Sequence, residues 1–556
     1  APSTVGSVPI TVEVSNKEGK ATGVASVLVS VSPTGPIITG VNPAEAKTGM
    51  EIEITGAGFG SRQGGSSVVI GGAAASSILS WSDTEIRAVV PADASNRVVK
   101  VVVGGVESSP GALVLLWEKE NPENVAISTA AGEQISPRLT SDGAGGAIIA
   151  WADFRNGATA DIYAQRVNGS GVVQWAADGI SLSTAANNQT FPQLISDGSG
   201  GAIVVWEDNR TGSADIYAQR VNHDGTAAWT IDGIPISAAA NSQLSPQLVS
   251  DGSGGAIIVW QDHRNGTTDL YAQRVNGAGS LQWSADGVAV TTAPSAQQSA
   301  ALVSDGAGGA IIVWQDHRAG TNSDIYAQRI GADGVVQWGA DGLAISTAAG
   351  NQQFPQLVSD GAGGAIAFWQ DRRSGTDKIY AQRVNGAGAL QWSAGSVPLS
   401  TTANSQTSPQ LIPDGAGGAI VVWQDGTDID AQRVNGAGAV QWSADGVALS
   451  TASDIQSFPQ IIPDGSGGAI VAWSDRRNGA DYDLYTQRVN SAGVIQWTAE
   501  GIPLSTAPHD QSSGGATSPP EIIADGSGGA IVVWQDQRSG TTRDIYAQGI
   551  SASGRE

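Results

Sequence analysis

The chain has 556 residues, which is too long for one ordinary hydrophobic core unless the residues form repeats. It carries 28 Lys plus Arg against 52 Asp plus Glu, and the net charge of −24 argues against nucleic acid and anionic membranes as partners. The absence of cysteine excludes disulfides, zinc–thiolate sites and a cysteine nucleophile. No run of about 18 apolar residues is present, so we expect no membrane insertion.

Composition also bears on where the protein works. The 74 glycines, with abundant Ala, Ser, Thr and Val and few Lys, are typical of turn-rich all-β surface proteins. The sequence begins at Ala1 without the charged and apolar regions of a signal peptide. We therefore expect an extracellular or cell-surface protein, secreted by means of a signal peptide that this sequence lacks.

Residues 1–35 contain two alternating strand patterns, at 8–15 and 24–32, joined by a turn at 16–19. A hairpin alone is marginal in water, and each of these strands carries a stripe of valine or isoleucine on one face. We expect the hairpin to pair with strands from outside this chain: an upstream part of a longer precursor, another copy, or another surface protein.

Residues 36–111 are predicted to form a small β-sandwich. The first half of this segment is rich in Pro and Gly, and the second half contains a W-S-D-T-E-I run at 81–86 and a Val-Pro pair at 90–91. With these residues the segment resembles the IPT/TIG family of immunoglobulin-like domains. The resemblance implies a spacer or protein-contact module of a surface-displayed protein and implies no chemistry.

Residues 112–556 contain a repeated phrase close to S-D-G-x-G-G-A-I-x-x-W-x-D. Its spacing of about 54 residues suits a blade of four short strands. The sequence therefore predicts an all-β fold in which an eight-bladed β-propeller follows the sandwich. The aspartate of the phrase occurs at Asp142, Asp197, Asp251, Asp305, Asp360, Asp414, Asp464 and Asp525.

One repeat illustrates the predicted strands: 246–250, 256–261, 269–276 and a fourth around Gln282 and Trp283. The last repeat ends after Gln548 without a fourth strand. Leu115, Leu116 and Trp117, followed by residues 126–129, look like an orphan fourth strand with its connector. We therefore expect the ring to close by strand exchange, which removes an exposed sheet edge.

Loops at opposite ends of antiparallel strands fall on opposite faces of a propeller. One face carries the near-invariant tight turns, and the other carries the variable second-to-third loops and the inter-blade connectors, where we expect any ligand to bind. The predicted binding residues on this face are His263, His317, Arg372, Arg476, Asp481, Tyr482, His509 and Asp510.

Carboxylates recur beside arginine in each repeat, as in Asp262, Arg264 and Asp269. A carboxylate pair can act in catalysis or bind Ca²⁺, but a group repeated in nearly every unit is better explained by blade folding, with Asp and Arg paired. The sixth repeat loses this arginine, and Asp425, Asp428 and Asp430 could hold Ca²⁺. A trimmed hairpin without any cofactor is the alternative.

The repeat is also distantly similar to the Asp-box of sialidase-type propellers, S-x-D-x-G-x-x-W, although the order of its residues differs. No non-repeated residues match the arginine triad, tyrosine nucleophile and acid of those enzymes, so we predict no catalytic residues. Two functions lead: a structural subunit of an extracellular assembly, joined through residues 1–35, and a surface adhesin or glycan-binding propeller. A glycan-active enzyme comes third. Clustered exposed aromatic residues on the variable face would favour glycan binding.

Overall fold

The computed structural model divides into two compact units, residues 1–113 and 114–556. Among the described residues, no helix is long and apolar enough to cross a membrane. The described residues are 9–12, 25–28, 35–46, 49–91, 94, 98–112, 114–115, 124–393, 395–479, 481–511 and 519–554.

The N-terminal hairpin forms a two-stranded antiparallel sheet. Strand β1 (Pro9–Val12) pairs with β2 (Ala25–Leu28), and Pro9 lies opposite Leu28. No other strand in the described part of the chain joins this sheet. The predicted pairing with strands from outside the chain therefore stays a prediction.

The next domain consists of two sheets that share one apolar core. Inward-facing residues alternate along its strands, as Ile52 and Ile54 do on β5 and Val99 and Val101 do on β10, and all four are fully buried. One sheet has the order β3 (Ile37–Asn42), β5 (Glu51–Ala57), β9 (Glu85–Val89) and β8 (Ser77–Trp81). The other has the order β11 (Val106–Glu107), β10 (Val98–Val103), β6 (Ser67–Ile70) and β7 (Ala73–Ala74), with β12 (Gly111–Ala112) also paired to β10.

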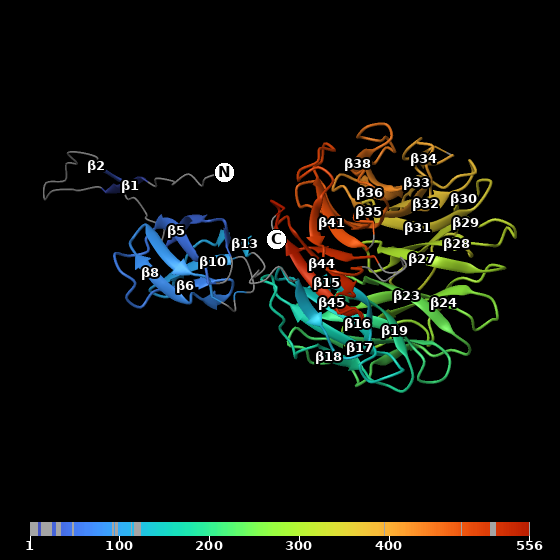
Figure 1. The fold of residues 1–556 in the computed structure, drawn as a ribbon, viewed down its shortest axis with the longest axis horizontal. Helices are drawn as coiled ribbons and strands as arrows, with labels where there is room; N and C mark the ends of the chain where they lie inside the picture. The colour runs from blue at the N-terminus through green and yellow to red at the C-terminus, as the bar shows by residue number, and fades with distance from the viewer. Residues whose placement is uncertain are drawn as a thin grey trace, which may run out of the picture. The chain divides into compact units, whose positions relative to one another are not determined.

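The rest of the described chain forms eight four-stranded antiparallel sheets, which we call blades 1 to 8 in chain order (Figure 1). The first strands are β15 (Gln134–Ser141), β19 (Gln189–Ser196), β23 (Gln243–Ser250), β27 (Gln297–Ser304), β31 (Gln352–Ser359), β35 (Gln406–Pro413), β39 (Gln456–Pro463) and β43 (Glu521–Ala524). The second strands are β16 (Ala147–Asp153), β20 (Ala202–Asp208), β24 (Ala256–Asp262), β28 (Ala310–Asp316), β32 (Ala365–Asp371), β36 (Ala419–Asp425), β40 (Ala469–Asp475) and β44 (Ala530–Asp536). The third strands are β17 (Asp161–Val167), β21 (Asp215–Val221), β25 (Asp269–Val275), β29 (Asp324–Ile330), β33 (Lys378–Val384), β37 (Asp428–Val434), β41 (Asp483–Val489) and β45 (Asp544–Ile550). The fourth strands are β18 (Ile180–Ser183), β22 (Ile234–Ser237), β26 (Val288–Thr291), β30 (Leu343–Ser346), β34 (Val397–Pro398), β38 (Val447–Ser450), β42 (Ile502–Ser505) and, in blade 8, β14 (Val125–Ser128).

Apolar side chains of neighbouring blades form the cores of the propeller. The second strands are almost wholly buried because they are covered on both faces, which explains their continuous apolar sequence. Trp260 of blade 3 is fully buried in a cluster with Ile203 and Ile216 of blade 2. The first tryptophan of every other repeat is likewise buried in a cluster shared by two neighbouring blades.

The fourth strand lies later in each repeat than the sequence predicts. In blade 3 it is β26, whereas Gln282 and Trp283 belong to the loop before it. The main chain of this loop bonds both to strand β25 and to a side chain of that strand: Gln282 N donates to the Arg274 carbonyl at 2.7 Å, and Trp283 N donates to Gln273 Oε1 at 3.0 Å. Gln273 Nε2 in turn donates to the Ser284 carbonyl at 2.7 Å. The Gln-Trp segment is thus anchored to β25 by one isolated bridge and by the Gln273 side chain, and the regular ladder resumes only at β26.

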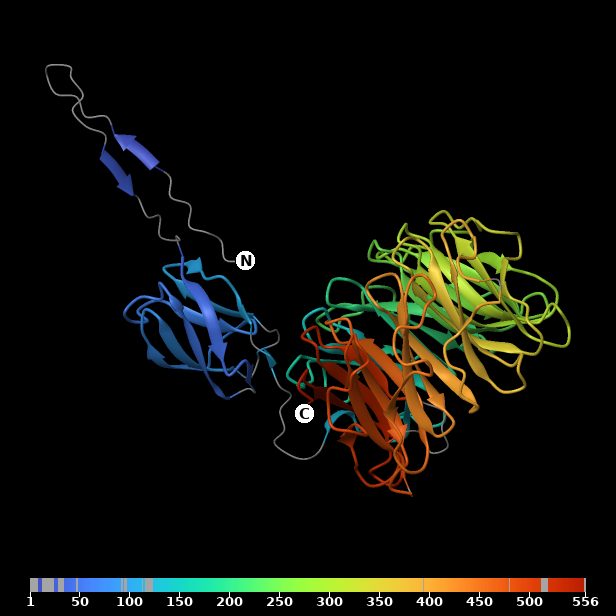
Figure 2. The same ribbon diagram turned by 90° about the horizontal axis from the view of Figure 1, so that it is seen from above.

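Blade 8 is completed by a strand from the start of the ring. Strand β14 pairs with β45, with Val125 opposite Ala547, and Ile127 is buried with Ile531 and Ile149, which joins blade 8 to blade 1. Figure 2 shows these first and last blades side by side. The closing strand is Val125–Ser128; Leu115 belongs to a separate short strand, and residues 116–117 lie outside the described residues.

Candidate binding site at the mouth of the central channel

The first strands of the blades converge on a cavity of about 390 Å³. Each blade contributes to the lining of this cavity the residue at the same position of its repeat, although these residues lie about 50 or more positions apart in the chain. The cavity therefore lies where the eight first strands meet, at the centre of the ring. We call the eight residues at this position the channel ring, and the open side of the cavity that they line the channel mouth. The residues are Arg138, Gln193, Gln247, Ala301, Gln356, Gln410, Gln460 and Glu521.

The first strands of blades 1 to 7 bulge just before their channel-lining residues. In blade 5 the ladder to β32 is interrupted between Gln353 and Gln356, and Phe354 has a φ of 51°. Seven blades share this left-handed conformation at a residue other than glycine, which is uncommon and costs conformational energy. The seven residues are Ser136, Phe191, Ser245, Ser299, Phe354, Ser408 and Phe458, with φ between 51° and 55°.

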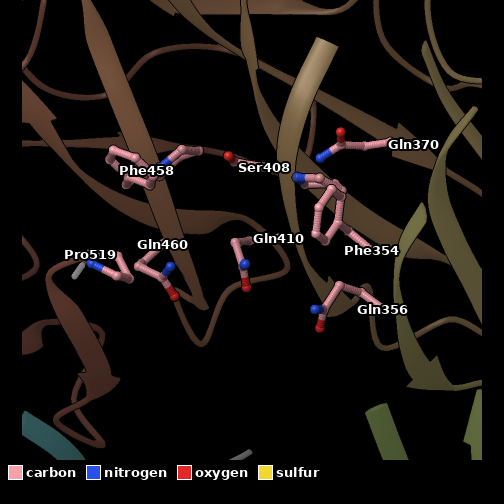
Figure 3. A pocket seen from close by; sticks show the side chains of 10 residues that line it. Phe354, Gln356, Gln370, Ser408, Gln410, Phe458, Gln460 and Pro519 are labelled. Atoms are coloured by element: carbon pink, nitrogen blue, oxygen red, sulfur yellow. The ribbon is translucent and has the colours of Figure 1, made fainter. Parts of the chain in front are cut away.

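Phenylalanine occupies the bulge position in three blades and leaves aromatic surface partly uncovered at the channel mouth. Phe191 is 56% exposed and Phe354 is 52% exposed. Phe354 and Phe458 line a pocket of about 270 Å³ together with three glutamines of the ring. Figure 3 shows Gln356, Gln410 and Gln460 in a row below the two phenylalanines. The pocket thus combines amide groups with aromatic and proline surface.

Charge enters this ring only at the junction of the first and last blades. Arg138 Nη1 donates to Glu521 Oε1 across that junction, and both side chains are mostly buried. At the bulge of blade 3, Glu207 accepts a hydrogen bond from the Ser245 backbone at 2.7 Å. Burial raises the pKa of Glu207, and the bond from Ser245 opposes that shift. The other six residues at this position, five glutamines and one alanine, are neutral.

The predicted loop residues of blades 3 to 5 lie in separate turns after the second strands. The His263 backbone donates to the Ser242 carbonyl at 3.0 Å. His317 Nε2 lies 2.9 Å from Gln298 Nε2 and 3.0 Å from Gln315 Nε2. Arg372 Nε pairs with Asp377 Oδ1 at 3.2 Å. None of these three side chains lines the two channel pockets.

The predicted residues of blade 7 and its connector do come together. The guanidinium of Arg476 lies 5.6 Å from the centre of the Tyr482 ring. The Tyr482 backbone donates to Asp510 Oδ1 at 3.0 Å, and the preceding residue, His509, has a φ of 66°. Asp481 adds negative charge that helps to raise the pKa of Asp483, after the larger effect of burial.

The repeated Asp–Arg pairs are part of the blade structure. In blade 3, Trp260 Nε1 donates to Asp262 Oδ2 at 2.8 Å, and Arg264 Nη2 donates to the same oxygen at 2.6 Å. Arg264 also lies 3.9 Å above the Tyr271 ring and donates to a connector carbonyl at 2.7 Å. These contacts confirm the structural interpretation of the repeated aspartate and arginine.

The sixth repeat does not form the predicted metal site. The described residues contain no group of three His, Cys, Asp or Glu side chains that could hold a metal, and this includes Asp425, Asp428 and Asp430. The reason is the two-residue turn: Asp425 pairs directly with Asp428 in the ladder, whereas Asp430 lies opposite Trp423. Burial, then Asp425 and Asp428, raise the pKa of Asp430 to about 7.

Sequence reasoning missed the channel ring and its phenylalanines. The available signal was the repeated x-Pro-Gln phrase, in which x is serine in several repeats and phenylalanine at 191, 354 and 458. In the expected first strand at 246–250 the glutamine position lies within the strand and the x position directly before it, and neither belongs to a variable second-to-third loop. The bulge, which a sequence pattern does not reveal, gives the phenylalanine position its left-handed backbone conformation.

The match of residues 36–115 to the IPT/TIG family identifies the two-sheet domain as an IPT/TIG domain. Cyclomaltodextrin glucanotransferases of Niallia circulans and Bacillus sp. (strain 6.6.3) are each 39% identical to this chain over 85 residues. That match covers 14% of this chain and 11% of each curated relative.

Several solved structures are similar in fold at low identity. A puromycin-hydrolyzing peptidase of Mycobacterium tuberculosis has a TM-score of 0.39 and 12% identity, covering 76% of this chain and 60% of that chain. An α-L-arabinanase of Penicillium chrysogenum has a TM-score of 0.33 and 14% identity, covering 56% and 94%. An auxiliary nutrient binding protein of Bacteroides ovatus has a TM-score of 0.29 and 13% identity, covering 79% and 95%. None of these values carries an activity over to this chain.

Proposed function

We propose that the propeller is a non-catalytic carbohydrate-binding domain of an extracellular protein, with neutral saccharides bound at the channel mouth. The observation that carries this proposal is the combination of ring glutamines with partly exposed phenylalanines. An amide both donates and accepts hydrogen bonds, as sugar hydroxyls do, and an aromatic face covers the apolar face of a sugar ring.

The scarcity of carboxylates at the mouth favours binding over hydrolysis. Glycoside hydrolysis ordinarily uses two carboxyl groups about 5 to 10 Å apart. Among the described residues that line the two pockets, Glu521 is the only carboxylate, and it is paired with Arg138. The short match to enzymes named for glucan transfer supports a carbohydrate setting for this protein.

The test replaces Phe191, Phe354 and Phe458 with serine, the residue that occupies the same backbone position in Ser245 and its counterparts. The triple variant should fold normally and lose at least tenfold in affinity for neutral oligosaccharides, measured by calorimetry with linear α-glucan and arabinan fragments. Ile231→Ser, at a residue 83% exposed and outside the pocket linings, is the matched control. Unchanged affinity in the triple variant, or no oligosaccharide binding by the native chain, would refute the proposal.

A second proposal concerns assembly. In the described part of the chain the β1–β2 sheet has no third strand, and a free sheet edge is a template for pairing with another chain. We infer that this hairpin joins a neighbouring subunit by β-strand addition. Light scattering of the full chain and of a chain without residues 1–35 tests this: only the full chain should associate. Two monomers of equal stability would contradict it.

A further inference from the structure

In seven of the eight blades, an arginine guanidinium group occupies the same position, between the end of the second strand and the tyrosine of the third strand. The aspartate at the end of the second strand accepts bonds from an arginine two residues later, and that arginine lies over the tyrosine of the third strand. In blade 3, Arg264 Nε donates to Asp262 Oδ1 at 2.8 Å. Across the seven blades, the guanidinium carbon lies 3.7 to 4.0 Å from the tyrosine ring centre.

Blade 6 keeps the aspartate and lacks the arginine. Asp425 is 2% exposed, and its Oδ2 accepts bonds from Thr402 at 2.9 Å and Gln406 at 3.1 Å. Its Oδ1, the oxygen that receives arginine Nε in the other blades, has no hydrogen-bond partner. Leaving a buried carboxylate oxygen unpaired costs free energy, so this position is built for a donor that the blade does not supply.

Two residues that contact the arginine in the other blades have counterparts in blade 6, although the Ser400 hydroxyl there bonds to Thr402 Oγ1 at 3.3 Å. In blade 3 the arginine also approaches the Ser237 hydroxyl at 3.5 Å and the Asp286 carbonyl at 2.7 Å. The corresponding residues of blade 6 are Ser400 and Asp445. At the tyrosine position blade 6 has Asp430, which lies opposite Trp423 as Tyr271 lies opposite Trp260.

Charge at this position favours a cation from outside. Asp425, Asp428 and Asp430 form no salt bridge in the described structure. Lys378 of the neighbouring blade donates instead to the carbonyls of Thr402 and Asn404. A second carboxylate in place of a tyrosine adds electrostatic attraction for a cation where the other blades offer a ring face.

We propose that blade 6 binds a guanidinium cation, namely an arginine side chain presented by a partner protein. The planar group would enter past Asp430, which is partly exposed, and would pair with Asp425 Oδ1. A guanidinium fits better than a metal ion because the position is shaped for it in seven sister blades and because the carboxylates do not converge on one point.

The experiment follows the indole N–H resonance of Trp423 in the full chain by nitrogen-15 NMR. Trp423 Nε1 lies 3.4 Å from Asp425 Oδ2, against 2.7 to 2.9 Å in the other seven blades. Methylguanidinium, N-acetyl-arginine methylamide, N-acetyl-lysine methylamide and calcium chloride are titrated separately. Both guanidinium probes should shift this resonance saturably, and the arginine amide should bind at least tenfold more tightly than the lysine amide.

The key variant replaces residues 425–430 with residues 262–271 of blade 3, which restores an internal arginine and tyrosine. This graft should raise the melting temperature and abolish the response to guanidinium probes. Asp224→Asn, an exposed change on a third-to-fourth turn that also removes negative charge, should leave the response intact. Equal binding by the graft, or no saturable shift with either guanidinium probe, overturns the proposal. A response to calcium alone that the graft abolishes overturns it too, in favour of a metal site.

Discussion

At the scale of single residues, the two tryptophans of a repeat, Trp260 and Trp283 in blade 3, have different structural roles. Trp260 is fully buried between blades, whereas Trp283 lies in a loop and donates through Nε1 to the Ala332 carbonyl of the next blade at 3.0 Å. The first is a core residue and the second an inter-blade hydrogen-bond donor. Both recur because both connect one repeat to the next.

Replacing these two residues should therefore give unequal losses. Trp260→Ala removes a large buried side chain and should lower the free energy of unfolding by about 3 to 5 kcal/mol. Trp283→Ala loses one hydrogen bond and part of a contact and should cost about 1 kcal/mol. Denaturant unfolding of both variants checks this, and equal losses would show that the burial of Trp260 is not the source of stability.

Single carboxylates also set the pH dependence of stability. Burial, with lesser effects of neighbouring carboxylates, raises the folded-state pKa of Asp430 to about 7, and of Asp483 and Asp544 to about 6. Between the unfolded pKa near 4 and these values, the folded chain binds more protons than the unfolded chain, so stability falls as pH rises.

The melting temperature should therefore be higher at pH 5 than at pH 8. Asp197 and Asp251 act in the opposite sense, because bonds from backbone amides and arginine outweigh burial and lower the pKa of each. Their contribution is lost only as pH falls below about 4. The triple Asn variant of residues 430, 483 and 544 should flatten the fall above pH 5. A melting temperature that rises from pH 5 to pH 8 would contradict this account.

At the scale of elements, one short strand decides whether the ring has an open edge. Strand β14 covers β45, and the Asn124 side chain just before it accepts a bond from Arg538 at 2.7 Å and donates to the Leu504 carbonyl at 3.1 Å. In blades 1 to 4 and in blade 7, the carbonyl of a connector residue accepts a hydrogen bond from the corresponding arginine. In blade 8, Asn124 Oδ1 accepts this bond instead.

A chain that begins at residue 129 should lose this protection. Ile127 leaves a core and the backbone edge of β45 becomes free, so we expect a loss of roughly 3 kcal/mol or more and self-association through that edge. A chain that begins at residue 124 keeps both β14 and Asn124 and is the control. Melting curves and light scattering of the two chains compare them, and identical behaviour would mean that β14 does not hold the ring closed.

At the scale of the whole propeller, the pair of Arg138 and Glu521 marks the junction of the ring. Five of the other six blades have glutamine at this position, so the ends of the repeat array carry the charges. Glu521→Gln restores the common residue but leaves Arg138 unpaired. We expect a loss of about 1 to 2 kcal/mol in the free energy of unfolding, and Arg138→Gln combined with Glu521→Gln should recover part of it. A double variant less stable than Glu521→Gln would show that the pair does not act as a unit.

The sequence alone determined the features that depend on local pattern. The buried second strands, the repeat length, the inter-blade tryptophans and the IPT/TIG domain all follow from residues close together in the chain. The structural interpretation of Asp262 and Arg264 followed from their repetition.

Only the tertiary structure decided the rest. The fourth strand lies at Val288–Thr291, and the Gln273 side chain bonds to the loop before it, which is a contact between residues that the alternating pattern does not encode. The channel ring joins residues about 50 positions apart, and the bulge that exposes Phe354 is a backbone choice within an apparently regular strand. The missing partner of Asp425 Oδ1 is likewise recognised only by comparison with the other seven blades, in which arginine bonds to this oxygen, because hydrogen bonding depends on positions in space and not on the order of residues.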